Sequence, residues 1–225
     1  RGVTLEAKAI LLELSSSPNY ALRARYALGA LDVTQARLQD AMGWFQQNLD
    51  VDVSNQMDRQ VVDLSILALG RVNYELEDFN AAAMHYSHIS GDSEFLDDAL
   101  YELAWTNIDR DDVAGALHAI DIYLLRFPES ARSGRLRVVR GHLMMRADRF
   151  EEATELYKEV VDTWEGMRGA TRLIVADSER ASVWASGGAT EQDGVPTWIG
   201  NFFAEDETVS RTWAVKEDLR RQGLR

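Results

Sequence analysis

The stretch YELAWTNIDRDDVAGALHAI, residues 101–120, carries the spacing that predicts the fold. A small residue, Ala104, is followed nine, twelve and sixteen positions later by Val113, Ala116 and Ile120. Two antiparallel helices joined by a tight turn need this order, because they approach closely only where the crossing side chains are small. We therefore expect Ala104 and Ala116 to meet at a crossing, with the larger residues filling the volume on either side.

The same offsets occur three more times along the chain. The other sets are Gly29, Leu38, Ala41 and Phe45; Gly70, Phe79, Ala82 and Tyr86; and Gly141, Phe150, Ala153 and Tyr157. Four matches indicate four helix–turn–helix units between residues 22 and 167, each with its alanine buried at the crossing. The first residues of the four sets lie 41, 34 and 37 positions apart, so we expect the extra residues to loop out between units.

Polar residues mark the expected turn inside each unit. The turn segments are DRDD at 109–112, ELED at 75–78 and RADR at 146–149. Aspartate favours turns and helix N-caps, because its carboxylate accepts hydrogen bonds from backbone N–H groups. The acidic clusters here lack the ligand spacing and central glycine of a calcium loop, so we interpret them as turns and helix starts.

The spacing of 34 residues between Gly70 and Ala104, in a helix–turn–helix unit, resembles the tetratricopeptide repeat. The LG dipeptide that ends at Gly70 and the proline at Pro128, which closes a second helix, fit the same pattern. The chain departs from it at the first-helix aromatic position, where Asn73 and Asn107 stand. The resemblance implies an all-α, right-handed α-solenoid of antiparallel helix pairs.

Both ends of the chain lie outside the four units. Residues 3–15 carry the second-helix signature, so we expect a partial repeat over 3–20 whose first helix is missing. Because the chain begins with Arg1, we expect a piece of a longer protein. The solenoid is predicted for 1–167, and a C-terminal helical cap or extension for 168–225. That extension is expected to contain helices at 168–186 and 206–222 and a loop at 186–194.

Composition excludes several classes of function. The chain of 225 residues has a net charge of −13, which disfavours binding to nucleic acid or anionic lipid. It has no cysteine, so disulfides, zinc thiolates and cysteine nucleophiles are excluded. It shows no phosphate loop, dinucleotide fingerprint or nucleophile elbow. His85 and His88 have metal-compatible spacing but no evident third ligand. We expect no enzyme activity, cofactor or metal, and no membrane span in this chain.

The resemblance also implies a binding surface, because in tetratricopeptide proteins the first helix of each unit lines a concave groove. The residues predicted to bind a partner are Arg23, Tyr26, Arg71, Tyr74, Glu75, Asp98, Tyr101, Trp105, Asp109, Arg135, His142 and Arg146. Aromatic and arginine side chains are common interface anchors. The alternative is that Tyr101 and Trp105 pack under neighbouring helices. The lysine–asparagine clamp for a peptide carboxylate is absent, so binding of chaperone tails is not supported.

A local excess of arginine lies between residues 130 and 150, where Asp148 is the one opposing acid. The run consists of Arg132, Arg135, Arg137, Arg140, Arg146 and Arg149. Guanidinium groups bind carboxylates bidentately, which favours a protein partner with an acidic peptide or helix. The alternative is pairing with acids of neighbouring repeats.

The function predicted from these features is a protein–protein interaction scaffold. The FPES segment at 127–130 and the RFEEA segment at 149–153 resemble repeats of bacterial envelope proteins. That resemblance favours a periplasmic or cell-envelope location over the cytoplasm. The alternative function is a helical arm or regulatory domain of a larger enzyme, such as one that acts on the cell wall.

Overall fold

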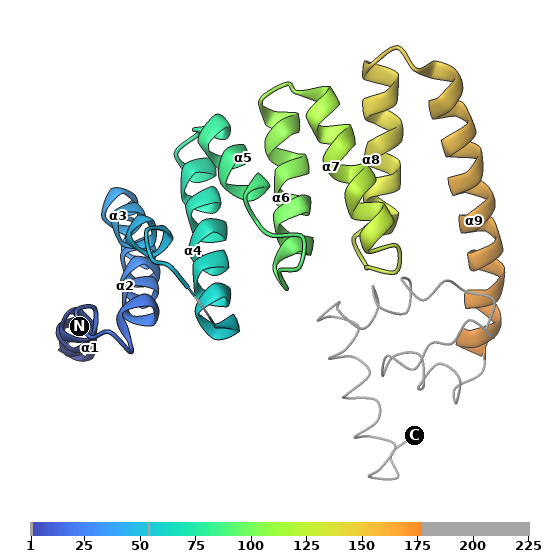
Figure 1. Ribbon diagram of the computed structural model, residues 1–225. Coiled ribbons are helices and arrows are strands. Elements are labelled where there is room, and N and C mark those ends of the chain that lie inside the picture. Colours follow the sequence, from blue (N-terminus) through green and yellow to red (C-terminus); the bar gives the residue numbers. More distant parts are fainter. Residues whose placement is uncertain (1, 54, 177–225) are drawn as a thin grey trace, which may run out of the picture. The chain divides into compact units, whose positions relative to one another are not determined.

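The computed structural model describes residues 2–53 and 55–176, and these residues fold entirely into helices and their connections. The helices are α1 (Gly2–Leu14), α2 (Ala21–Thr34), α3 (Leu38–Leu49), α4 (Gln56–Glu75), α5 (Phe79–Ser87), α6 (Leu96–Asp109), α7 (Val113–Arg126), α8 (Ser133–Arg146) and α9 (Phe150–Ala176) (Figure 1). No strand occurs in this part of the chain. The all-α expectation is confirmed.

The helices from α2 onward succeed one another as the four predicted pairs, α2 and α3, α4 and α5, α6 and α7, and α8 and α9. Packing contacts join α2 with α3, α4 with α5, and α8 with α9. The helix α1 precedes them and packs on α2. The chain divides into two compact units, residues 1–119 and 120–225, and each unit is described by itself. The right-handed superhelix stays a prediction. The predicted loop at 186–194 and helix at 206–222 lie outside the described residues.

Every pair is joined by the same backbone turn. In the second pair, the N–H of Asp78 donates to the carbonyl of Asn73 at 2.9 Å, and the N–H of Glu77 donates to the carbonyl of Tyr74 at 2.9 Å. This is the Schellman arrangement that closes a helix with a left-handed residue. Equivalent bonds join Arg37 to Asp32, Asp112 to Asn107, and Arg149 to Met144, at 2.8–2.9 Å.

The left-handed residues of these turns are not glycines. They are Ala36, Glu77, Asp111 and Asp148, with φ angles of 56°, 60°, 61° and 57°. The next residue in each turn is already the N-cap of the second helix. At Asp78 and Asp112 the side chain accepts the N–H of the residue three positions later, at 3.0 and 2.8 Å. The expected aspartate caps are therefore confirmed at these two turns.

Small residues make the close crossings, as the offsets predict. Ala41, Ala82 and Ala116 are fully buried, and Ala153 is 1% exposed. A Cβ atom added to Gly70 would lie 2.4 Å from the ring of Tyr86. A Cβ atom added to Gly29 would lie 2.4 Å from the ring of Phe45, and one added to Gly141 would lie 2.5 Å from the ring of Tyr157. The aromatic ring sixteen residues after the glycine therefore occupies the space above it, which is why no larger residue fits there.

The two asparagines that depart from the family pattern are buried near the turns. Asn73 is 4% exposed, and its Nδ2 donates to the carbonyl of Leu69 at 2.7 Å. Asn107 is 5% exposed. At the equivalent position, three residues after the small residue, the first pair has Asp32 and the fourth has Met144, and both are also buried. This position is therefore buried in all four pairs, whether the residue is charged, polar or apolar.

The last described helix corrects one expectation. α9 runs without a break from Phe150 to Ala176, so no separate helix begins at residue 168. Gly166 and Gly169 lower helix propensity, but a glycine ends a helix only where a left-handed cap forms, and none forms here. The predicted domain boundary at 167/168 stays a prediction, since residues 177–225 lie outside the described part.

Candidate protein-binding surface on the first helices

All the residues predicted to bind a partner lie on first helices of the pairs. Arg23 and Tyr26 are on α2, Arg71, Tyr74 and Glu75 on α4, Asp98, Tyr101, Trp105 and Asp109 on α6, and Arg135, His142 and Arg146 on α8. The helices α2, α4 and α6 belong to the first compact unit, and α8 belongs to the second. Within the first unit, side-chain contacts bring together the predicted residues of α4 and α6.

Arg71 is the centre of the contacts between α4 and α6. Its Nε lies 2.9 and 3.0 Å from the two carboxylate oxygens of Glu102, and its Nη2 lies 3.4 Å from Oδ2 of Asp98. The hydrogen bonds with Glu102 raise the pKa of Arg71 above its ordinary value, although partial burial opposes this. Arg71 therefore pairs with acids of the neighbouring repeat.

A tyrosine hydroxyl makes the second contact across these helices. The O–H of Tyr74 donates to Oδ2 of Asp109 at 2.5 Å. This hydrogen bond, with burial and the charge of Asp109, raises the pKa of Tyr74 to about 12. The ring of Tyr74 also meets Phe79 edge-on, with centroids 5.3 Å apart. Tyr74 and Asp109 are thus one polar link between neighbouring repeats.

Glu102 belongs to this surface and is missing from the predicted set. Glu102 accepts the hydrogen bond from Arg71. Burial raises the pKa of Tyr86, and the charge and hydrogen bond of Glu102 raise it further. The sequence contained a signal for it. Asp98, Glu102, Trp105 and Asp109 follow one another at spacings of four, three and four, which place them on one side of a helix.

The aromatic side chains of the predicted set pack against their own neighbours. Tyr26 is half-buried, with its ring centroid 5.6 Å from that of Phe45. Tyr101 and Trp105, both half-buried, meet edge-on at 6.1 Å. Arg23 is exposed and lies 3.5 Å from Asp58 at the start of α4. The α2 residues are therefore joined to the fold by packing and by one surface ion pair.

On α8, Arg135, His142 and Arg146 are all exposed. The ring of His142 lies 5.9 Å from that of Tyr157 on α9. Arg140 and Arg149, which belong to the arginine run, pair with acids of the chain. Arg140 donates to Asp121 at 2.6 Å, and Arg149 donates to Glu152 at 2.5 and 2.7 Å. Internal pairing, the alternative for this run, is thus seen at Arg140 and Arg149.

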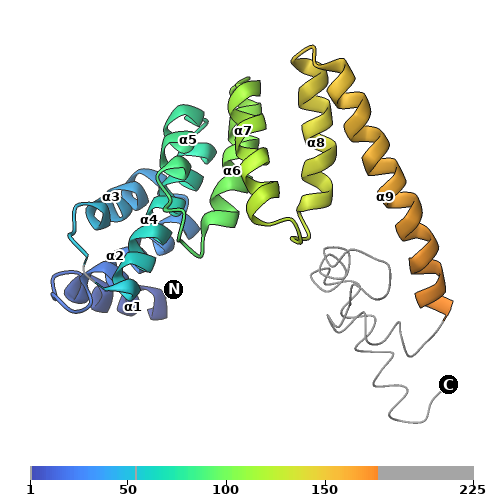
Figure 2. The same cartoon turned by 45° about the vertical axis from the view of Figure 1, so that its right-hand side comes forward.

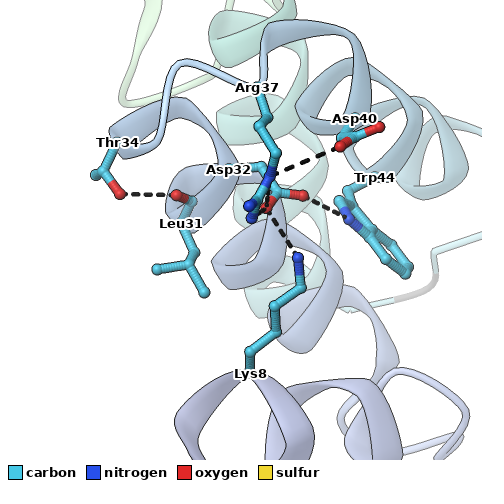
Figure 3. A network of polar contacts seen from close by, with 7 residues as sticks. All are labelled: Lys8, Leu31, Asp32, Thr34, Arg37, Asp40 and Trp44. Atoms are coloured by element: carbon cyan, nitrogen blue, oxygen red, sulfur yellow. Dashed lines mark hydrogen bonds and ion pairs between the residues drawn. The ribbon is translucent and has the colours of Figure 1, made fainter. Parts of the chain in front are cut away.

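A buried carboxylate forms a separate polar cluster at the first turn (Figure 3). Asp32 is 1% exposed and accepts hydrogen bonds from Lys8 Nζ, Arg37 Nε and Trp44 Nε1, each at 3.1 Å. Burial disfavours the charged form of Asp32, but the bonds from Arg37 and Lys8 outweigh it and lower its pKa. Because these contacts are internal, we interpret the cluster as a structural link between α1, α2 and α3.

Neither a metal site nor a membrane-spanning helix is found among the described residues. No three His, Asp or Glu side chains there come together in an arrangement that could hold a metal ion. Burial lowers the pKa of His85, and the nearby His88 adds to this effect. None of the described helices has the length and hydropathy needed to cross a membrane.

Comparisons with known proteins support the fold. The chain is similar in structure to RapI in its apo form, with a TM-score of 0.50 and 16% sequence identity. The similarity covers 96% of this chain and 77% of RapI. At this identity the likeness shows the fold alone, which is a helical repeat. No protein-family model matches the sequence, and no curated protein matches it.

Proposed function

We propose that this chain is a non-catalytic protein–protein interaction scaffold of the tetratricopeptide type. It binds a peptide or helix of its partner along the first helices of its repeats. The observation that carries the proposal is the continuity of one surface over α4 and α6, where Arg71 meets Glu102 and Tyr74 meets Asp109. Repeats that stack in this way present side chains from successive units to one elongated ligand.

The aromatic residues Tyr74, Tyr101 and Trp105 supply the contact area of this surface. Tyr74 is 37% exposed, and the other two are half-buried. Partly exposed aromatics that are held by neighbours bind at a low entropy cost, since little side-chain freedom remains to be lost. Acidic residues of the partner would meet Arg135 and Arg146, which lie on α8 and are exposed.

The proposed setting is the bacterial cell envelope, on the periplasmic side. This part of the proposal rests on the FPES and RFEEA segments and on their likeness to envelope repeat proteins. The first segment forms a tight connection between α7 and α8, where the hydroxyl of Ser133 donates to the carbonyl of Phe127 at 2.6 Å. The second segment begins α9.

The test is a titration of the whole chain with a partner recovered from a periplasmic extract. Trp105→Ala should weaken binding by about thirtyfold, which corresponds to about 2 kcal/mol for a hot-spot residue. Arg146→Glu should chiefly slow association and reduce its salt dependence. The matched control is Trp164→Ala, because Trp164 is also a partly exposed tryptophan but lies on α9, outside the predicted surface.

Normal binding by Trp105→Ala and Arg146→Glu would contradict the proposed surface. Loss of binding on deletion after Gly194, with both point variants normal, would transfer the function to the C-terminal segment. The helical-repeat fold would stand in either case, since it rests on other observations.

A further inference from the structure

A second surface lies between α8 and α9, apart from the residues predicted to bind a partner. The two helices meet at the turn over residues 146–149 and diverge along their length (Figure 2). A groove of about 790 Å³ runs between them. Its lining residues are Arg140, Met144, Glu151, Glu152, Glu155, Leu156, Lys158, Glu159, Asp162 and Thr163.

The groove combines an apolar floor with a charged rim. Met144 on α8 and Leu156 on α9 are 3% and 8% exposed and form its buried part. The side chains of Glu152 and Glu155 are 56% and 74% exposed and stand at the edge. A ligand in this groove would therefore touch carbon atoms below and carboxylates at the side.

The acids of the groove outnumber the cations that neutralise them. Five of the lining residues are acidic and two are basic. Arg140 is bound to Asp121 at 2.6 Å, and Lys158 to Glu155 at 2.8 Å. Glu152 is neutralised by Arg149, which lies next to the groove. The other three lining acids, Glu151, Glu159 and Asp162, form no ion pair within residues 2–53 and 55–176.

These three acids lie with Glu155 in a stripe along α9. Residues 151, 155, 159 and 162 are separated by four, four and three positions, so they share one side of the helix over about 16 Å. Like charges at this spacing destabilise a helix. Cations placed along the stripe would relieve this repulsion.

We infer that the α8–α9 groove is a docking surface for a basic amphipathic peptide segment of another protein. Lysine or arginine side chains of that segment lie along the acidic stripe, and its apolar side chains rest on Met144 and Leu156. Charge complementarity selects this occupant. A single metal ion does not fit, because the carboxylates follow one another along the helix and no metal-holding group occurs among the described residues. This inference is independent of the proposed function.

The experiment measures binding of the full chain to a labelled peptide of leucine and lysine in helical spacing, at low salt. The triple variant Glu151→Gln, Glu159→Gln and Asp162→Asn should bind it about tenfold more weakly. The matched control neutralises three exposed acids of the first compact unit, Glu13→Gln, Asp92→Asn and Glu94→Gln. It has the same net charge as the test variant and should bind within about twofold of the parent.

A second peptide, with serine in place of leucine and the same lysines, tests the apolar floor. It should bind the parent about fivefold more weakly, because it buries no apolar side chains. Thermal unfolding verifies that both triple variants are folded, and loss of the stripe should not lower the melting temperature. Equal losses in the two triple variants, or equal binding of the two peptides, would show unspecific attraction to an acidic chain and overturn the inference.

Discussion

The first helix pair and the second share a turn but use it differently. Both turns have the same two backbone hydrogen bonds and a left-handed residue, Ala36 in one and Glu77 in the other. In the second pair the buried residue at the start of the turn is Asn73, and the N-cap is Asp78. In the first pair the acid is the buried residue, Asp32, and the N-cap position is occupied by Arg37.

This difference shows that the backbone of the turn does not depend on the polar side chains around it. Asn73 satisfies its amide within its own helix, by donating to the carbonyl of Leu69. Asp32 instead requires donors from outside α2, and it takes them from α1 and from the turn and helix that follow. The first pair thus uses the same internal position to attach a neighbouring helix. Four substitutions test this interpretation.

The largest effect is expected for Asn73→Asp. The carboxylate would be buried, could not donate to Leu69, and would gain no cation of the kind that Arg37 and Lys8 supply to Asp32. We expect a loss of about 3–5 kcal/mol in the free energy of unfolding at neutral pH, measured by urea denaturation. Adding Asp78→Arg, which copies the first turn, should restore part of this loss. If Asn73→Asp alone is as stable as the parent, a buried acid at this position does not need the cations that Asp32 has, and the interpretation is wrong.

The reverse change, Asp32→Asn, should destabilise the first pair by about 2–3 kcal/mol, because charge-assisted hydrogen bonds to a buried acceptor are lost. The pKa of Asp32 is lowered in the fold from its ordinary value of 3.8. The ionised carboxylate therefore stabilises the fold at pH values above 3.8. That contribution is lost as pH falls through the folded-state pKa. The gap between parent and variant should therefore narrow in acid below pH 3.8. A gap that is constant down to low pH would contradict the assigned role.

The contact from α1 is tested by Lys8→Met. In the first three pairs the position after the crossing alanine is apolar: Met42, Ala83 and Leu117. Ala83 and Leu117 are buried, and Met42 packs on the core of Ala41, Phe45, Leu69 and Val72. Lys8 is 30% exposed, so solvent weakens its ion pair, and we expect a loss of about 1 kcal/mol.

The loss from Lys8→Met should be local to α1, because repeat proteins open unit by unit. Hydrogen exchange of the amides of α1 is the measurement, and the amides of α4 serve as the internal control. Unchanged protection of α1 would mean that packing on α2, and not the ion pair, holds this helix in place.

The smallest effect is a stabilisation. Ala36 is exposed and has a φ of 56°, which disfavours any side chain with a Cβ atom. Ala36→Gly should raise the free energy of unfolding by about 0.5–1 kcal/mol. Asp148→Gly is the control, because aspartate tolerates this conformation better and should gain less. If Ala36→Gly lowers the melting temperature, the left-handed turn is not the conformation of the first pair in solution.

Some features of the candidate surface could be predicted from the sequence, and others could not. Arg71, Tyr74 and Asp109 follow from the repeat register, which assigns them to first helices. Their partners do not follow, since Arg71 and Glu102 are 31 residues apart and Tyr74 and Asp109 are 35 apart. The extent of α9 was also missed, because the repeat pattern stops near residue 167 whereas the helix continues to Ala176.

The sequence by itself determined the helix pairs. The requirement for a small residue opposite an aromatic ring, as at Gly70 and Tyr86, acts within one pair and repeats at a constant offset. Only the tertiary structure decided which polar residues meet. Asp32 and Asp109 are both acids on first helices, yet Asp32 is 1% exposed among three donors, and Asp109 is exposed and holds Tyr74. The physical reason is that burial and pairing depend on how neighbouring helices pack. The packing of residues that are far apart in the sequence is not encoded in any local spacing.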